Sequence, residues 1–231
     1  MRNERKGIAM SREKSYCIIK KDGYAYFPIK AKSGPYRDKA DQLIIGYLAG
    51  MPNFFGGTVE SDKGKDKYDT LVDEVSQESQ ENITINFSDT DSKDEKRKKI
   101  ENACVLLNSF TFEGRNPTTY YFYCLNADAD ANADADQPSV TIKGFENSNV
   151  LELSTDARLK EEYREMSCIL KIPVDQLCKN FVNFLDKCIE TGSEYLWDKR
   201  TITEHQDWKD EGTQNAFRAF CMNYGGKDAI H

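Results

Sequence analysis

The chain has few of the features that mark several common kinds of functional site. Only two of its 231 residues are histidines, and neither His205 nor His231 has a serine, cysteine or acidic residue at a catalytic spacing. No apolar run approaches the ~20 residues of a transmembrane helix. Residues 1–14 are charged and lack the apolar centre of a signal peptide. We therefore expect no catalytic histidine, no membrane span and no classical secretion.

An excess of positive charge is also absent. The chain has 32 basic and 39 acidic residues, which gives a net charge of −7. A general nucleic-acid-binding protein would normally carry a basic surface, so we expect none here. A nucleotide-sized anion could still bind through a metal ion and local arginines, and charge alone suggests four candidates: Arg37, Arg115, Arg158 and Arg164.

The cysteines do not form a metal or redox motif. There are seven, widely spaced, with no pair separated by two residues. Several lie in apolar segments, where a free cysteine packs as a small hydrophobic residue. We predict a reducing, cytoplasmic-type compartment; secretion by a route without a classical signal peptide is left open.

The pattern of segments predicts one large α/β domain with additions. We expect an N-terminal tail at 1–13, a domain over 14–190, and a C-terminal helical extension at 191–231 packed on the domain. Three segments of the domain read as insertions: 30–51, 88–99 and 127–137. The last is an Ala-Asp repeat, and we interpret it as a solvated loop because it lacks the glycines and bidentate glutamate of an EF-hand.

Several strands and helices can be predicted locally. Asp22-Gly23 lies between β-rich runs at 15–20 and 24–29, which indicates a hairpin. Further strands are expected at 102–112, 118–125, 140–145 and after Glu165. Apolar residues at three- and four-residue steps predict a helix over 174–189, and helical potential is also present at 39–48, 155–164 and 194–224.

The most informative stretch is a glycine pair followed by an acidic helix. Gly56-Gly57-Thr58-Val59-Glu60 ends an apolar run, and a helix is predicted from Asp66 to about Asn82. Glu74 and Glu78 are four residues apart, so they are neighbours on that helix and flank its apolar stripe. Their repulsion costs a few tenths of a kcal/mol, which a bound magnesium ion would offset. The alternative is an ordinary acidic helix surface.

This stretch resembles the Nudix box, G-x5-E-x7-R-E-U-x-E-E-x-G-U, in which U is aliphatic. Phe54-Phe55-Gly56-Gly57-Thr58-Val59-Glu60 resembles the entry phrase of the family, and Asp73-Glu74-Val75-Ser76-Gln77-Glu78 resembles its R-E-U-x-E-E. Asp73 replaces the arginine, Gln77 replaces a glutamate, and Gln80 stands where glycine is expected. The loop after Glu60 is about two residues longer than usual.

The resemblance implies a fold, a reaction and a set of residues. The fold would be an α/β/α sandwich with a mixed sheet, and the reaction Mg²⁺- or Mn²⁺-dependent hydrolysis of a diphosphate linkage in a nucleoside diphosphate joined to another group, such as ADP-ribose or a dinucleotide. Glu78 would be a metal ligand, and Glu74 a ligand or the general base. Further contributions are implied for Gly57 and Gln77 (metal), Gly56 and Gly57 (diphosphate), Glu60 (loop) and Glu165 (a further catalytic acid). Apart from the resemblance, Tyr121 is a candidate for stacking on a base, although alternate residues of a strand more often belong to the core.

Two other functions remain open on the sequence. Because Asp73 and Gln77 depart from the pattern, the chain could be a nucleotide-binding or regulatory module that has lost turnover. It could instead act as an interaction protein through its insertions and the aromatic C-terminal extension. A homodimer or a protein partner at that extension is compatible with the sequence, which identifies neither the exact substrate nor the oligomeric state.

Overall fold

In a computed structural model, the residues described are 12–31, 52–113, 117–128, 137–154, 156, 159, 165–179 and 212–225. Their centre is a seven-stranded sheet with the order β5-β6-β1-β2-β9-β8, to which β3 adds by pairing with β1. Its strands are β1 (Arg12–Lys21), β2 (Tyr24–Lys30), β3 (Phe55–Thr58), β5 (Cys104–Phe112), β6 (Thr118–Asn126), β8 (Val150–Glu152) and β9 (Met166–Pro173).

The sheet is mixed, as expected. β1 runs parallel to β6, whereas β1 pairs antiparallel with β2 and with β3. The predicted hairpin is confirmed: Asp22 and Gly23 have φ values of 52° and 76°, and Lys21 lies opposite Tyr24. Two successive residues with positive φ match the right-handed twist of the flanking strands, which is why this dipeptide favours a tight hairpin.

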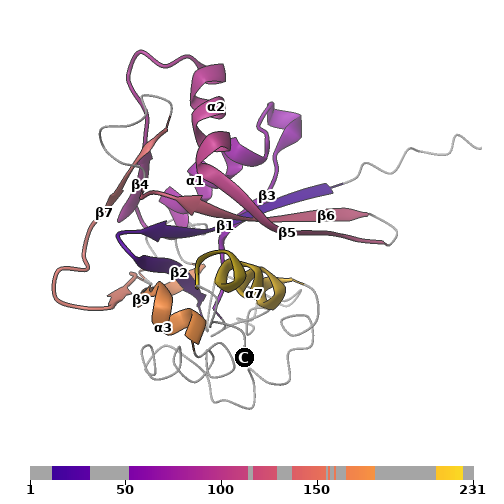
Figure 1. The fold of residues 1–231 in the computed structure, drawn as a ribbon. Coiled ribbons are helices and arrows are strands. Elements are labelled where there is room, and N and C mark those ends of the chain that lie inside the picture. Colours follow the sequence, from indigo (N-terminus) through magenta and orange to yellow (C-terminus); the bar gives the residue numbers. More distant parts are fainter. Residues whose placement is uncertain are drawn as a thin grey trace, which may run out of the picture.

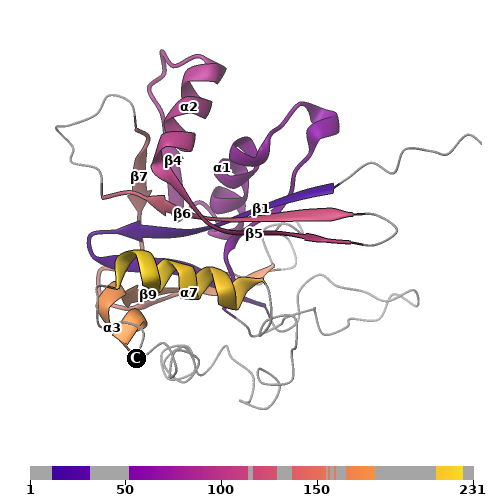
Figure 2. The same ribbon diagram turned by 45° about the vertical axis from the view of Figure 1, so that its right-hand side comes forward.

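Helices cover both faces of the sheet (Figures 1 and 2). One face carries α1 (Lys67–Glu78) and α2 (Lys93–Ala103), and the other carries α3 (Val174–Lys179) and α7 (Thr213–Tyr224). Alternate residues of β1 divide between two buried clusters: Cys17 and Ile19 lie in the cluster with the helix residues Leu71 and Val75, whereas Ile18 lies in the cluster with Phe217. The predicted α/β/α layering is confirmed.

The strand expected at 140–145 is present as β7 (Ser139–Ile142), whereas strands β4 (Ile83–Asn86) and β8 and helix α2 were not predicted from the sequence. β4 pairs with β7 in a separate two-stranded sheet. Helix α2 occupies most of the charged segment that we interpreted as an insertion, and it begins with a capping box in which Ser92 and Glu95 bind each other's backbone N–H groups. The strand expected from residue 102 therefore begins at Cys104.

Some predictions lie outside the described residues. They include the helix at 39–48, most of the segment 155–164, the helix beyond Lys179, and most of the loop 127–137. The proposed domain boundaries remain predictions. Within the described part of the chain no helix is long and apolar enough to cross a membrane, and the six cysteines described there are free.

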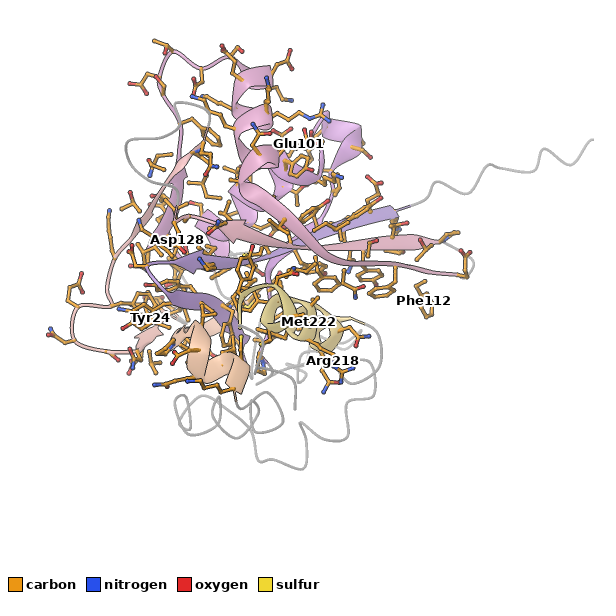
Figure 3. All side chains as sticks on the ribbon, in the orientation of Figure 1. Tyr24, Glu101, Phe112, Asp128, Arg218 and Met222 are labelled. Carbon is orange, nitrogen blue, oxygen red and sulfur yellow. The ribbon has the colours of Figure 1, made fainter. Side chains whose placement is uncertain are left out.

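Helix α7 belongs to the core of the sheet's second face. Phe217 is fully buried, and the centroid of its ring lies 5.1 Å from the ring centroid of Phe27 and 4.7 Å from that of Phe54. Met222, on the same helix, is 62% exposed and points away from the sheet (Figure 3). The C-terminal aromatics Phe217 and Phe220 are therefore packing residues, not a free surface.

The packing of α7 predicts a large difference between two truncations on one helix. Phe217→Ala should lower the free energy of unfolding by roughly 3–5 kcal/mol, because it removes a buried ring and leaves a cavity. Met222→Ala should change it by less than about 0.5 kcal/mol. Urea denaturation of both variants measures this; a similar small effect in both would show that α7 contributes little to the core.

Candidate active site

The candidate site lies where β1 changes partner. Ile19 to Lys21 pair with β2, whereas Lys14 to Cys17 pair with β3 on the same side of the strand. Among the described strands, β3 pairs only with β1. Its second edge therefore faces other parts of the molecule, and helix α1 supplies the side chains that reach it.

The first contact at this edge is between Gly56 and Glu78. The backbone N–H of Gly56 donates a 2.8 Å hydrogen bond to the Glu78 carboxylate (Oε2). Gly56 has a φ of 153°, and a Cβ there would lie 2.0 Å from the carbonyl oxygen of Ser15 and 2.6 Å from the Cα of Tyr16. Only glycine can take this conformation at so close a strand approach. Gly56 therefore determines how the backbone of β3 passes the carboxylate of Glu78.

The second contact is between Gly57 and Glu74. A Cβ on Gly57 would lie 2.1 Å from Oε1 of Glu74. The carboxylate of Glu74 thus occupies the space that any other residue's side chain would fill. The two carboxylates that the sequence pattern singled out are both brought to the glycine pair, one to each glycine.

Helix α1 places these acids through its own packing. Its N-terminus is fixed by a capping box, in which Asp66 accepts the N–H groups of Tyr68 and Asp69 while Asp69 accepts that of Asp66. Leu71 and Val75 are buried against the sheet. Because residues three and four apart share a helix face, Glu74 and Glu78 follow these apolar residues to the edge of the core.

The end of α1 accounts for one departure from the family pattern. Gln80, which stands where glycine is expected, has a φ of 51°, in the left-handed region that favours glycine. Its side-chain amide holds this turn: Nε2 donates to the Ser154 carbonyl at 2.7 Å, and Oε1 accepts the Ser154 N–H at 2.8 Å. Two tertiary hydrogen bonds offset the strain that glycine would avoid.

Burial raises the pKa of both glutamates. Glu78 is 2% exposed, and its pKa lies well above the usual range because of burial and the neighbouring charge of Glu74. Burial first, and then the charge of Glu165, raises the pKa of Glu74 to about 7. Two acids held close together in a poorly solvated place favour either a proton or a cation.

Glu165 belongs to the same electrostatic cluster. It precedes β9, and its carboxylate forms a 3.0 Å ion pair with Lys30 at the end of β2. Lys30 in turn lowers the pKa of Glu74 and of Glu78. The structure therefore brings Glu165 to the neighbourhood of the two helix glutamates, together with a lysine that the sequence analysis did not identify.

A second ion-pair group braces the loop beside the site. The ammonium of Lys65 lies 3.0 Å from Glu60 and 2.8 Å from Asp73. It thus joins Glu60, the second residue after β3, to Asp73, the residue before Glu74 on α1. Asp73 stands where the Nudix pattern has arginine. In this chain Asp73 is the acidic partner of the ion pair, and Lys65 in the loop is the basic partner. Such half-exposed pairs contribute little to stability individually, but these two share one ammonium group and fix the relation between two elements.

The remaining candidates are Tyr121, Gln77 and four arginines. Tyr121 is separated from Gly57 by strand β1, since Ser15 pairs with both; its hydroxyl donates to Glu13, and the ammonium of Lys67 lies 4.9 Å from its ring centroid. Gln77 is half-buried on α1 beside Glu78. The four candidate arginines, Arg37, Arg115, Arg158 and Arg164, lie outside the described residues.

The hydrogen-bond pattern between β1 and β3 also distinguishes the carbonyl groups of Gly56 and Gly57. The Val59 N–H binds the Glu13 carbonyl, and hydrogen-bonded pairs alternate along an antiparallel ladder. The peptide groups of Gly57 therefore face Ser15 in β1, whereas those of Gly56 face away from it, as the bond from Gly56 to Glu78 requires. The carbonyl of Gly56 is thus better placed to face a ligand than that of Gly57, which the sequence analysis favoured.

Ser15 is a further buried group at this point that sequence reasoning missed. It is fully buried opposite Gly57, and its hydroxyl is the one buried side-chain polar atom of the described residues that has no hydrogen-bond partner. No local pattern distinguishes it, because a serine in a strand carries no signal until its partners are known.

Comparison with known proteins gives fold likeness only. No family model and no curated protein matches the chain. Among solved structures, the chain is similar to a NUDIX hydrolase from Alicyclobacillus acidocaldarius (11% identity, 81% of this chain and 86% of that one, TM-score 0.38). It is also similar to an Ap4A hydrolase binary complex from C. elegans (11%, 93% and 98%, TM-score 0.31). A third is a Francisella tularensis bifunctional NMN adenylyltransferase/ADP ribose pyrophosphatase complexed with AMP and a Mn ion (12%, 78% and 42%, TM-score 0.29). Since these TM-scores are below 0.4, the functional argument rests on the residues of the chain itself.

The two glycines predict opposite kinds of defect. Gly57→Ala should leave the fold largely intact but displace Glu74, because the new methyl group meets only the end of a flexible side chain. Gly56→Ala meets backbone atoms at a φ of 153° and should lower the free energy of unfolding by more than about 1 kcal/mol. Thermal melting and a Mn²⁺-binding assay on both variants measure this. Unchanged Mn²⁺ binding in a folded Gly57→Ala variant would contradict the arrangement.

The raised pKa of Glu74 predicts how stability changes with pH when no divalent cation is present. The folded protein holds this proton more tightly than the unfolded chain does, so the fold is stabilised below pH 4.5, and this contribution is lost as the pH rises to about 7. The difference corresponds to roughly 3 kcal/mol. Denaturation between these pH values measures it, with Glu74→Gln as the control, which should have a flatter profile. Identical profiles would contradict the assignment.

Proposed function

We propose that the chain is a Nudix-type hydrolase that cleaves a diphosphate linkage in a nucleoside diphosphate joined to another group, with Mg²⁺ or Mn²⁺. The observation that carries this proposal is the contact of two acids with two glycines: the Glu78 carboxylate on the Gly56 N–H, and the Glu74 carboxylate in the space of the missing Gly57 Cβ. A glycine-lined strand edge admits a diphosphate closely, and the adjoining acids suit a hard cation.

The donor set fits a divalent cation in chemistry. Glu74 and Glu78 are buried carboxylates with raised pKa values, so they carry negative charge at a cost that a cation would remove. Among the described residues no group of three histidine, cysteine or acidic side chains is close enough to hold a metal ion. Oxygens from the Gly56 carbonyl, the Gln77 amide, substrate and water would complete the coordination.

Each residue would have a separate role in the proposed hydrolysis. A bound divalent cation would supply Lewis acidity and lower the pKa of a coordinated water. Glu78 would hold the cation. Glu74, whose pKa of about 7 lies near neutrality, would hold the cation or accept the proton of the attacking water, since a general base works best when its pKa is close to the working pH. Glu165 would act from the residue before β9, beside Lys30, and the glycines would let the diphosphate approach.

One observation favours the binding-module alternative. Lys30 already provides positive charge to all three acids, through its ion pair with Glu165 and its effect on Glu74 and Glu78. A site balanced in this way could hold a nucleotide without turning it over. The two functions differ in one measurable property, which is product release in the presence of magnesium.

Assays with ADP-ribose, dinucleotides and nucleoside triphosphates in Mg²⁺ test the proposal. We expect monophosphate or phosphate products, and a loss of at least about 10²-fold in kcat for Glu78→Gln and Glu74→Gln. Glu81→Gln, just beyond the helix, is the matched control and should retain activity. Ligand-dependent melting shifts without hydrolysis would instead support the binding module, and equal activity in Glu78→Gln and the wild-type protein would refute the site.

A further inference from the structure

Two lysines lie near the acids, on strands that are distant in the sequence from helix α1. Lys14 lies on β1 opposite Thr58, the residue that follows Gly57. Lys30 is the last residue of β2, and its side chain is 15% exposed in its ion pair with Glu165. The strand pairing thus brings one lysine next to the glycine pair and the other to the end of the neighbouring strand. Neither belongs to the box-like motif.

The two ammonium groups influence each other. Burial, and next the charge of Lys30, lowers the pKa of Lys14, while Glu165 and Glu74 raise it. Lys14 is half-buried, and its ammonium lies 5.6 Å from the ring centroid of Tyr120. Two like charges held in a partly buried place repel each other, and an anion between them would remove that repulsion.

Charge balance indicates which anion. Fully ionised, the three acids Glu74, Glu78 and Glu165 and the two lysines carry a net charge of −1, and one divalent cation would bring it to +1. With the cation on the glutamates, positive charge remains on the side of Lys14 and Lys30. That arrangement matches a phosphoryl group bound to the cation on one side and to the lysines on the other.

We propose that Lys14 and Lys30 form the phosphate-contacting side of the site and bind the diphosphate of the substrate opposite the helix glutamates. This inference rests on the proposed function and adds the residues that hold the anion. It predicts that the lysines contribute to substrate binding and not to metal binding. Removal of Lys30, which competes with a cation for the acids, should leave Mn²⁺ affinity unchanged or increase it.

Binding of the non-hydrolysable α,β-methylene analogue of ADP-ribose in Mg²⁺, measured by calorimetry, tests the inference. Lys14→Met and Lys30→Met should each weaken binding by roughly 10-fold or more, the usual effect of losing a charged hydrogen bond, whereas Lys30→Arg should retain most of it. Mn²⁺ binding without the analogue, followed by electron paramagnetic resonance, should be unchanged or tighter in Lys30→Met.

Lys20→Met is the matched control. Lys20 is on the same strand and the same face as Lys14, but it pairs with Asp128. Figure 3 shows Asp128 and Phe112 at opposite ends of the sheet. Lys14 lies toward the end with Phe112, because it is two residues from Arg12, Arg12 pairs with Thr118, and Thr118 pairs with Phe112. This variant should bind the analogue as the wild-type protein does.

The outcomes separate the two proposals. Normal analogue binding in both lysine variants, together with an inactive Glu78→Gln, would overturn the inference and leave the proposed function standing. Loss of Mn²⁺ binding in Lys30→Met would also overturn it, since the lysine would then support the metal site. A wild-type protein that neither binds the analogue nor hydrolyses a diphosphate would overturn the proposed function and this inference with it.

Discussion

The site depends on the absence of two side chains. At Gly56 and Gly57 strand β3 has no side chains, and the carboxylates of Glu78 and Glu74 occupy the space next to its backbone. A helix and a sheet normally meet through apolar side chains on both elements. Here the edge of that contact is a strand without side chains and a helix turn with two acids. Any ligand at this edge therefore meets peptide groups and carboxylates, which suit a cation and a phosphoryl group together.

Two departures from the Nudix pattern have structural counterparts in this chain. Gln80 takes the left-handed conformation that glycine would favour, and its amide binds both backbone groups of Ser154. Asp73 replaces a basic residue, yet Lys65 brings a basic group to it from the preceding loop and also binds Glu60. In both cases a contact that the motif does not contain holds the local geometry of this chain.

The sequence predicts what depends on neighbouring residues and misses what depends on distant pairing. The hairpin follows from Asp22-Gly23, and the closeness of Glu74 to Glu78 follows from helical spacing. Lys30 reaches Glu165 across 135 positions through the β2–β9 ladder, which no local pattern reveals. The face of Tyr121 was equally hidden, because a shift of one residue in register moves a side chain to the opposite face. Helix α2 was missed because its dense charge obscures its short apolar stripe, Ile100 and Ala103.

The small number of acids has a consequence for how a cation and a substrate would bind. Two carboxylates leave much of the coordination of a hard cation to a backbone carbonyl, an amide, water or the ligand. A diphosphate supplies oxygens for those positions, and Lys14 and Lys30 face its other side in our proposal. Cation and anion would then each increase the affinity for the other by the same factor, because such coupling is reciprocal. A site of this kind would bind either one weakly alone, and the charge of Lys30 partly balances the three acids between binding events.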